Sequence, residues 1–407
     1  MDADTVMARC DALQEHTEEP GKLTRRFATP ALEAATATVE GWMRETGLET
    51  RRDAVRNLFG RYEGARDDAP AFLIGSHLDS VPDGGRYDGP LGVLTALAVV
   101  ERFASRGERL PFALEVCAFS DEESVRYGTA YLGSSAVAGA FGDDWLDRVD
   151  RDGIAMRDAL RAVGGDPDAI ASCARNPADT VGWLELHIEQ GPTLESEGLP
   201  IGVVTGIQAA VRHAWEVRGM AGHAGTTPMA GRRDALAAAA ALVLAVEEIG
   251  RAMPDLVATV GIIDAEPGAM NVIPGRVTFT TDIRHPEDAR LAEAMAAIDR
   301  AVAAIAGERG VGISSTELSA DPSVPCDARL RAVLHDAIGA EGFPARDLAS
   351  GAGHDAAALA AICPVAMLFL RCEGGISHNP AENVDGLDVA IALDVMERAL
   401  LDLGARP

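Results

Sequence analysis

The sequence predicts an α/β protein into which a second domain is inserted, and three observations support this prediction. Short apolar runs typical of buried strands alternate with helical patterns in the first and last parts of the chain. Between residues 207 and 322 the order changes to strand, helix, two strands, helix and strand. The length of 407 residues also exceeds the usual size of one domain.

The first domain offers four strand candidates and a clear helix. Because strands that alternate with helices form a sheet covered on both faces, we expect helices on either side of these strands. Open sheets of this kind bind ligands where their strands end, so the polar residues that follow the four runs should meet at one edge. The strand candidates are residues 71–77, 112–120, 181–190 and 364–372, and the helix is residues 91–107.

The inserted segment predicts a compact ferredoxin-like unit, because its order is β-α-β-β-α-β. The chain should therefore form one discontinuous domain, residues 1–206 and 323–407, and one inserted domain, residues 207–322. Within the insert we expect strands at 209–220, 256–268, 276–285 and 311–320, and helices at 231–253 and 286–310.

Composition excludes several classes of partner. The formal net charge of -27 argues against nucleic acid and anionic membranes, since phosphate binding depends on Lys and Arg. No apolar run reaches the ~18 residues of a membrane span, and residues 1–21 lack the pattern of a signal peptide. Six scattered cysteines without a CxxC pair indicate reduced thiols rather than a disulfide framework, so we expect a cytoplasmic protein.

Residues suited to metal binding follow the first strand. His77 and Asp88 lie at the two ends of a glycine-rich turn. Imidazole and carboxylate ligands suit zinc, manganese and related ions, and one aspartate can bridge two ions through its two oxygens. Asp79, two residues beyond His77, is placed to orient that imidazole. A purely structural histidine at the strand end is the alternative.

The other three strands end in similar residues. Asp121, Glu122 and Glu123 follow the second strand, where neighbouring side chains point in opposite directions. One glutamate can therefore bind a metal while the next faces a substrate and carries a proton. For each group of polar residues taken alone, the ordinary explanation would be a solvated acidic loop or a histidine bonded to a backbone carbonyl. The remaining candidates are His187, Glu189 and Gln190 after the third strand and His378 after the fourth. Four such polar groups at one edge of the sheet favour a metal site.

Seven motifs together resemble the amidase, hydantoinase and carbamoylase branch of the M20 family of dinuclear metallohydrolases. The resemblance runs in order from about residue 50 to 385. It implies a zinc-peptidase-like catalytic domain with a mixed sheet, and an insert that acts as a lid and in dimerisation. The motifs are GSHLDSVPDGGRYDGPLGV, AFSDEESVRYGTAYLGS, LELHIEQGP, GMAGHAGTTPM, NVIPGRVTFTTDIRH, SGAGHDA and RCEGGISHNPAE.

The resemblance implies two divalent ions per subunit, Mn²⁺ or Zn²⁺, bridged by Asp88. Glu122 would be the general base and acid: two cations lower the pKa of a bridging water, and this carboxylate takes its proton and later delivers one to the leaving nitrogen. The metal ligands that the resemblance implies are His77 and His187 for one ion, Glu123 and His378 for the other, and Asp88 for both.

In the insert, the resemblance implies that His223 stabilises the oxyanion of the tetrahedral intermediate across a homodimer interface. Asn271 and Arg284 match positions that hold the substrate carboxylate, a role that suits a guanidinium because it forms two parallel hydrogen bonds. Gln190 and His354 match further substrate contacts. A surface-loop histidine and a surface charge are the alternatives for His223 and Arg284.

Two positions depart from the pattern of the family. Ser124 and Arg56 stand where glycine is usual. A side chain restricts such a turn. Because every ligand position is filled, we expect an adjusted turn rather than a lost site.

The family resemblance implies cleavage of a ureido or amide C–N bond in a small carboxylated substrate. The stretches SDEESVRYGTAYLGS and MLFLRCEGGISHNPAE most resemble allantoate amidohydrolases. They imply conversion of allantoate to ureidoglycine, ammonia and carbon dioxide in purine breakdown, with manganese favoured. The alternatives are N-carbamoyl-L-amino acids, N-carbamoyl-β-alanine and ureidoglycolate as substrates. An inactive binding protein on the same fold is disfavoured, because Glu122 and all the ligand positions are present.

Overall fold

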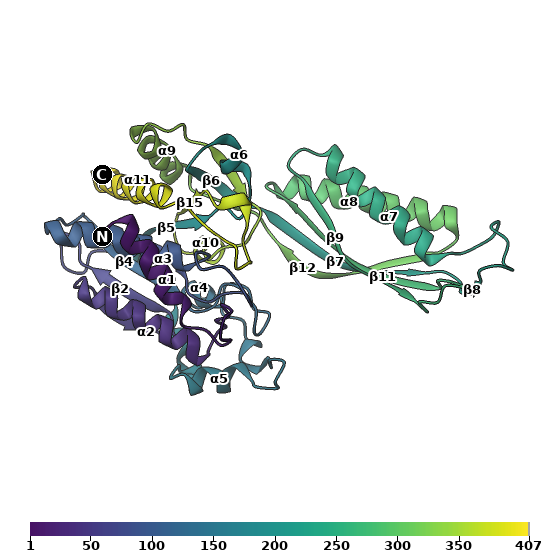
Figure 1. Cartoon of the computed structure of the whole chain (residues 1–407), viewed down its shortest axis with the longest axis horizontal. Helices are drawn as coiled ribbons and strands as arrows, with labels where there is room; N and C mark the ends of the chain where they lie inside the picture. The colour runs from purple at the N-terminus through teal and green to yellow at the C-terminus, as the bar shows by residue number, and fades with distance from the viewer. Residues whose placement is uncertain (406–407) are drawn as a thin grey trace. The chain divides into compact units, whose positions relative to one another are not determined.

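The computed structural model describes residues 1–405 of the chain, which form two compact units (Figure 1). Unit 1 comprises Met1–Thr205, Cys326–Leu348 and Gly353–Pro407, and unit 2 comprises Gly206–Pro325 and Ala349–Ala352. The α/β class with a mixed sheet is confirmed.

A nine-stranded sheet runs in the order β1-β2-β4-β3-β5-β15-β6-β13, and β14 pairs with β6. Its four central strands are parallel and contain the four predicted runs: β3 (Ala71–His77), β4 (Ala113–Phe119), β5 (Thr180–Ile188) and β15 (Val365–Leu370). All residues of β3, β4 and β15 are buried, which explains why these strands are continuous apolar runs rather than alternating ones. The flanking strands are β1 (Glu49–Arg52), β2 (Leu58–Tyr62), β6 (Ile201–Ile207), β13 (Val324–Pro325) and β14 (Asp347–Ser350).

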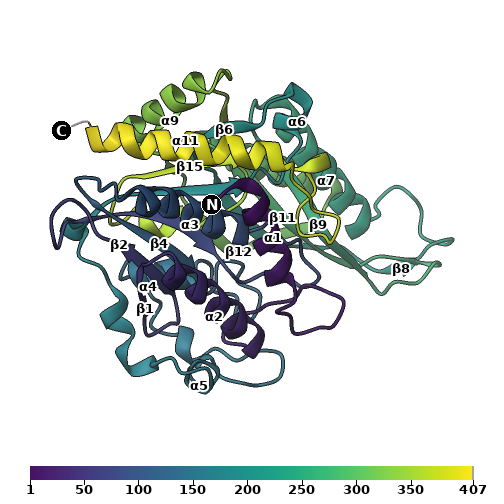
Figure 2. The same ribbon diagram turned by 60° about the vertical axis from the view of Figure 1, so that its left-hand side comes forward.

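One layer of helices builds the main core of unit 1. Figure 2 shows α11 along the sheet, with α9 on one side of it and α3 on the other. The helices of this layer are α1 (Ala3–Gln14), α2 (Pro30–Glu45), α3 (Pro90–Arg106), α9 (Ala328–Ala340) and α11 (Gly386–Ala405). Four shorter helices lie elsewhere in unit 1: α4 (Leu132–Val137), α5 (Met156–Ala162), α6 (Thr193–Glu197) and α10 (Ala356–Leu359).

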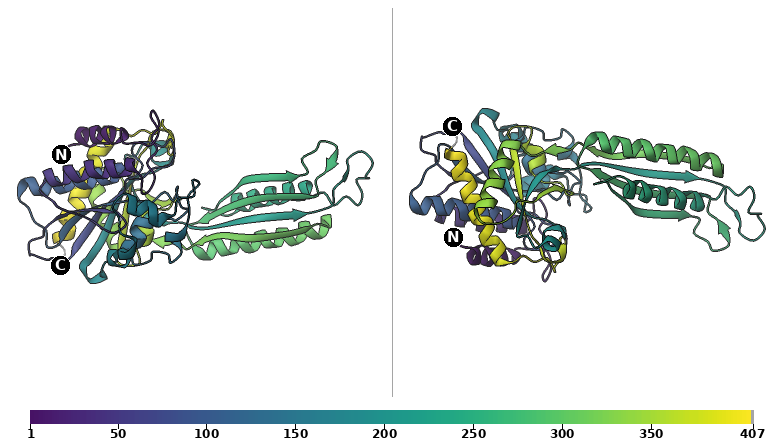
Figure 3. Two further views of the ribbon diagram at one scale, coloured as in Figure 1. Left: turned by 90° about the horizontal axis from the view of Figure 1, so that it is seen from below. Right: turned by 90° about the horizontal axis from the view of Figure 1, so that it is seen from above.

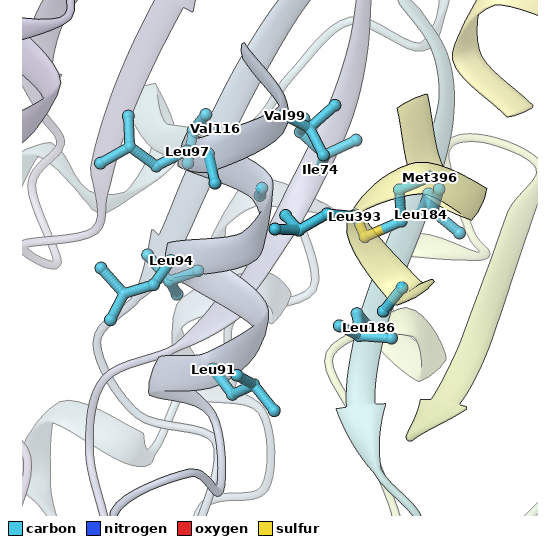
Figure 4. Close-up of a cluster of buried hydrophobic side chains, with 14 of the residues drawn as sticks. Ile74, Leu91, Leu94, Leu97, Val99, Val116, Leu184, Leu186, Leu393 and Met396 are labelled. Atoms are coloured by element: carbon cyan, nitrogen blue, oxygen red, sulfur yellow. The ribbon is translucent and has the colours of Figure 1, made fainter. Parts of the chain in front are cut away.

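Helix α3 is central to this core. It begins with Pro90 at its first position, which suits a proline because that N–H has no helical partner, and it ends at Gly107 in the left-handed conformation. Its side chains are buried on nearly every face of the helix. Figure 4 shows the cluster that they form with the sheet and with α11: Ile74, Leu91, Leu94, Leu97, Val99, Val116, Leu184, Leu186, Leu393 and Met396.

Unit 2 contains a four-stranded antiparallel sheet in the order β12-β7-β11-β9, with two long helices along it (Figure 3). Strand β11 (Arg276–His285) alternates buried and half-buried residues, since the helices cover one face of the sheet. The elements occur in the predicted β-α-β-β-α-β order: β7 (Ala209–Arg218), α7 (Ala235–Ala252), β9 (Val257–Glu266), β11, α8 (Asp288–Arg309) and β12 (Gly312–Asp321).

A small antiparallel pair of strands in unit 2 was not predicted. Strand β8 (Gly222–His223) pairs with β10 (Val272–Ile273), 49 residues apart by the pairing of His223 with Val272. Two-residue strands carry no periodic signal, so only the three-dimensional structure reveals this contact.

Two further features of the structure concern its helices and its cysteines. Across residues 1–405, no helix combines the length and apolarity that crossing a bilayer requires. All six cysteines are free and buried.

Glu115 is a buried charge in the middle of β4, and arginines compensate it. Its side chain accepts two hydrogen bonds from Arg175, at 2.7 and 3.1 Å, and one from Arg51 at 2.9 Å. Burial by itself would raise the pKa of Glu115, but the two guanidinium groups lower it below its ordinary value. The carboxylate is therefore charged at neutral pH and depends on these partners.

We predict that Arg175→Met destabilises unit 1 by roughly 2–3 kcal/mol, because it removes the main partner of a buried charge while Arg51 remains. Thermal and denaturant unfolding would measure the change. Arg161→Met is the matched control, because Arg161 pairs with Asp168 on the surface and such pairs contribute about 0–1 kcal/mol. Equal effects of the two substitutions would contradict the prediction.

Candidate metal centre

The carboxyl ends of the four parallel strands lie at one edge of the sheet. His77 at the end of β3 is level with Phe119 at the end of β4, and His187 in β5 is level with Phe369 in β15. Because parallel strands share a direction, the loops that follow them leave from the same edge. The residues named from the sequence in these loops therefore come close together.

Asp88 lies between three imidazoles. Its Oδ1 is 3.0 Å from His187 Nε2 and 3.5 Å from His77 Nε2, while its Oδ2 is 3.3 Å from His378 Nε2. Burial would raise the pKa of Asp88, but the histidines hold it well below its ordinary value. The two oxygens thus face different histidines, which is the arrangement a bridging carboxylate needs.

Glu123 completes the group around Asp88 Oδ2. Its Oε2 is 3.6 Å from His378 Nε2, and its Oε1 is buried without a hydrogen-bond partner in the described part of the chain. Burial and the nearby Asp88 raise the pKa of Glu123 to about 7. Hydrogen bonding to Asp88 raises that of His378 to about 9.

The structure offers two donor groups that fit divalent ions. One consists of His77, Asp88 and His187, and the other of Asp88, Glu123 and His378; within each, the ligand atoms lie within 4.8 Å of one another. Such combinations of imidazole nitrogen and carboxylate oxygen donors suit zinc and manganese. The orphaned Glu123 Oε1 supports this fit, because a buried carboxylate oxygen needs a partner. The groups are those that the sequence resemblance implied.

The glycine-rich turn places Asp88 against His77. Gly89 has a φ of 84°, a region that favours glycine, and it precedes Pro90 at the start of α3. A side chain at Gly89 would lie 2.5–2.8 Å from atoms of the His77 ring. The glycine is therefore needed for the turn and for the close approach of the imidazole.

Asp79 connects two of the strand ends. Its carboxylate accepts hydrogen bonds from the backbone N–H groups of Glu122, at 3.0 Å, and Glu123, at 3.1 Å. Its Oδ1 is also 3.2 Å from His77 Nδ1. The Asp79 carboxylate therefore contacts both the His77 ring and the loop that carries the two glutamates, and its role in orienting the imidazole stays a prediction.

Glu122 and Glu123 are both half-buried residues of this loop. Burial of the Glu122 carboxyl group raises its pKa well above the ordinary value, and the negative charges of Glu123, Asp355 and Asp79 act in the same direction. A carboxyl group with a raised pKa can accept and return a proton near neutral pH. Asp121 instead points into the interior, where burial and Asp79 raise its pKa, and one of its oxygens lacks a partner among residues 1–405.

Gln190 and His354 lie beside the same group. Gln190 Nε2 donates to Asp88 Oδ2 at 2.8 Å, and Gln190 has a positive φ of 57°. The buried His354 ring packs edge-on against His187, with centroids 4.4 Å apart. Burial and His187 lower its pKa well below the ordinary value, so this imidazole is neutral. Glu189 points elsewhere: it accepts hydrogen bonds from the backbone N–H groups of Thr193 and Leu194 at the start of α6.

Both departures from the glycine pattern have left-handed backbones. Ser124 has a φ of 62° and Arg56 a φ of 73°. This conformation costs roughly 1–2 kcal/mol for a residue other than glycine. The hydroxyl of Ser124 donates to Glu122 O at 3.3 Å, and Arg56 forms an ion pair with Glu33 at 2.6 Å. These contacts offset part of that cost, and the ligand positions of the turn are kept.

The remaining three candidates lie in unit 2, and they fall into two groups. His223 on β8 lies beside Asn271, whose carbonyl accepts a hydrogen bond from Ala224 N–H at 2.9 Å. His223 Nδ1 accepts from the N–H groups of Gly225 and Thr226, at 3.1 and 3.2 Å, so its Nε2 carries the proton. An exposed N–H donor of this kind can stabilise an oxyanion.

Arg284 lies near the other end of β11. This strand begins at Arg276, next to the paired strands β8 and β10, and eight residues of extended chain span about 26 Å. The structure therefore does not bring Arg284 together with His223 and Asn271 inside one copy of unit 2. The Arg284 guanidinium donates two hydrogen bonds of 2.7 Å to Asp282 and a third to Gly351 O.

Two residues near Asp88, the half-buried Ser377 and the buried Glu382, were missed in the sequence analysis. Ser377 and Glu382 lie on either side of His378 within a motif that was singled out, but neither was assigned a role. Their importance depends on contacts with residues almost 300 positions away, and sequence spacing does not reveal these contacts. Glu185, also buried, forms a third donor group with His187 and His354.

The chain is similar to known proteins over most of its length. Residues 73–402 match the model of "Peptidase family M20/M25/M40". An N-carbamoyl-L-amino acid amidohydrolase of Geobacillus stearothermophilus is 40% identical over 94% of both chains. A probable allantoate deiminase of Oryza sativa subsp. japonica is 38% identical over 95% of this chain and 85% of its own.

Solved structures are similar to the chain as well. The crystal structure of an amidase of the hydantoinase/carbamoylase family from Burkholderia multivorans has a TM-score of 0.93 and 36% identity, and covers 100% of this chain and 98% of its own. The resemblance inferred from the motifs is confirmed, and the chain belongs to the peptidase family M20/M25/M40.

Proposed function

We propose that this protein hydrolyses a ureido C–N bond in a small carboxylated substrate, with allantoate as the first candidate. The observation that carries the proposal is the cluster in which Asp88 faces three histidines, with Glu123 beside it and Glu122 next in the chain. Hydrolysis of that ureido C–N bond would release ammonia and leave a carbamate, which loses carbon dioxide to give ureidoglycine. Similarity to allantoate deiminases over 95% of the chain supports this substrate.

The cluster would hold two divalent ions. His77 and His187 would bind one, Glu123 and His378 the other, and Asp88 both. When bound, such ions make water more acidic and polarise a carbonyl group. Manganese is our first choice and zinc the second, because the donor set suits both.

Glu122 would carry the proton in this reaction. Its raised pKa allows it to take a proton from the attacking water, whose oxygen forms a bond to the ureido carbon. As the C–N bond breaks, the same carboxyl group returns the proton to the leaving nitrogen. Asp79 contributes by holding the backbone of Glu122 and the ring of His77 in place.

Recognition of the substrate by unit 2 would require two copies of the chain. Arg284 is suited to grip a carboxylate, and His223 Nε2 is suited to donate to an oxyanion. These two groups are separated by about the 26 Å length of β11, far more than the length of one small substrate. If both act on one molecule, His223 and Asn271 must come from a partner subunit.

The edge of unit 2 formed by β9 and α7 is a suitable dimer surface. Strand β9 is an edge strand that exposes Val257, Ile262 and Ile263, and α7, packed against it, exposes Leu244. An unpaired apolar edge strand favours pairing with another strand. We propose that two copies pair here around a two-fold axis, because such an interface can be formed by identical surfaces.

N-carbamoyl-L-amino acids are the second candidate. A relative with this activity in its name is 40% identical to the chain, and the chemistry requires the same metal ligands, base and carboxylate contact. The two substrates differ in the second arm: a polar ureido group in allantoate and an apolar side chain in many carbamoyl amino acids.

We predict that the manganese-loaded protein releases ammonia from allantoate faster than from a panel of N-carbamoyl-L-amino acids at equal concentration. Ammonia assays with product mass analysis would measure this. Preference for a carbamoyl amino acid would keep the mechanism and change the substrate. The same assay on chelator-treated protein is the control, and activity should return when Mn²⁺ is added back.

Glu122→Gln should lower kcat by about 10²–10⁴-fold, since it removes the proton carrier, while the bound metal stays near the wild-type amount. Metal analysis and steady-state kinetics on the same sample would separate the two effects. Glu197→Gln, a surface glutamate paired with Arg346, is the control and should leave both unchanged. Near-normal turnover of metal-loaded Glu122→Gln would refute this role.

Inactive Glu122→Gln and inactive His223→Ala subunits should regain activity when mixed. In a hybrid dimer one site receives both intact groups, so random exchange should restore about a quarter of the wild-type rate. Native mass spectrometry would verify that subunits exchange. Absence of recovery despite exchange would show that His223 does not act across the interface.

A further inference from the structure

A buried carboxylate outside the proposed chemistry holds the backbone at Asp88. Glu382 is only 1% exposed. Its Oε1 accepts hydrogen bonds from the backbone N–H groups of Tyr87, at 2.8 Å, and Asp88, at 3.1 Å. These two hydrogen bonds fix the orientation of the backbone at residues 87 and 88. Glu382 therefore determines the position of the Asp88 Cα–Cβ bond.

Ser377 extends this contact to the side chain of Asp88. Its Oγ lies 2.9 Å from Asp88 Oδ2 and 3.1 Å from Glu382 Oε2. A hydroxyl group has one proton, so it donates to one carboxylate at a time. Glu382 therefore touches Asp88 through the backbone on one side and through a hydroxyl group on the other.

The glycine-rich turn is shaped to admit this carboxylate. A Cβ at Gly85 would lie 2.1–2.4 Å from the carboxylate atoms of Glu382, well inside contact distance. Only glycine lets Glu382 approach the N–H groups of residues 87 and 88. Gly85 does not have a positive φ, so its backbone conformation does not require glycine. The close approach of the Glu382 carboxylate does.

The contact also joins the loop that carries Asp88 to the loop that carries His378. The loop with Asp88 follows β3, whereas the loop with His378 and Glu382 follows β15. Those strands are not neighbours in the sheet, since β5 lies between them. The hydrogen-bonded Glu382 carboxylate between the loops therefore restricts the distance between Asp88 and His378.

We infer that Glu382 is a positioning residue that holds the Asp88 carboxylate so that one oxygen faces His77 and His187 and the other faces His378. The inference rests on the proposed metal centre and not on the identity of the substrate. Residues that orient metal ligands in this way typically change metal affinity by about 10–100-fold when removed.

The test compares Glu382→Ala with Glu382→Gln. Alanine leaves the two N–H groups without a buried acceptor, and the apparent Kd for Mn²⁺ should rise by about 10–100-fold. Glutamine keeps an oxygen for those N–H groups and can donate its amide to Ser377 Oγ, so most of the affinity should be retained. Isothermal titration with Mn²⁺, and metal content after dialysis, measure this without any activity assay.

Gly85→Ala provides a second, independent variant. Its methyl group should displace the Glu382 carboxylate and weaken Mn²⁺ binding in the wild-type background. In Glu382→Ala, where there is no carboxylate to displace, the same substitution should add little further loss. Additive losses would mean that the two residues act separately and would contradict the inference.

Asp150→Ala is the matched control for Glu382→Ala. Asp150 is also a buried carboxylate that accepts hydrogen bonds from two backbone N–H groups, those of Asp152 and Ile154, but it touches none of the proposed ligands. Unfolding temperatures in chelator report the folding of every variant. A merely structural role for Glu382 would lower the unfolding temperature, as at Asp150, and leave the Kd of the folded protein unchanged.

The outcomes separate the inference from the proposed function. Wild-type affinity for Mn²⁺ in folded Glu382→Ala overturns the inference. If Glu382→Ala does not fold, wild-type affinity in folded Gly85→Ala overturns it instead. Failure of the wild-type protein to bind Mn²⁺ or Zn²⁺ would overturn the metal centre itself, and the variants would then show no difference to measure.

Discussion

The position of the Asp88 carboxylate is the constraint on which the rest of the candidate site depends. Its two oxygens face three histidines: His77 at the end of β3, His187 within β5, and His378 in the loop after β15. An error of one residue in the register of β3, β5 or β15 would move one of those imidazoles away. The apolar core under α3 therefore matters to the chemistry, because it fixes the register of the strands.

A second requirement is to keep several carboxylates close together inside the protein. Asp79, Asp88, Glu122 and Glu123 lie around the same group of histidines, and unpaired charges of one sign in such a place are costly. The structure offsets this cost with backbone N–H groups for Asp79, with imidazoles for Asp88, and with raised pKa values for the glutamates. A site built in this way attracts cations and provides a proton carrier from the same set of residues.

The two units contribute different kinds of groups. Unit 1 contains the carboxylates and buried histidines, whereas the candidates in unit 2 are donors: an imidazole N–H, an amide and a guanidinium. The donors lie near opposite ends of β11, so the length of a strand separates groups that would act on one substrate. This separation makes self-association part of the proposed function rather than an addition to it.

The sequence by itself determined the α/β class, the four central strands, the order of elements in the insert and the family, because apolar periodicity and contiguous motifs are local signals. It also named the residues that meet around Asp88, although their roles remain predictions. Only the tertiary structure decided which contacts join distant residues. The hydrogen bonds from Tyr87 and Asp88 to Glu382, the pairing of β8 with β10 and the distance of Arg284 from His223 follow from packing and strand register. Such contacts link positions far apart in the chain, and nothing in the local spacing of residues encodes them.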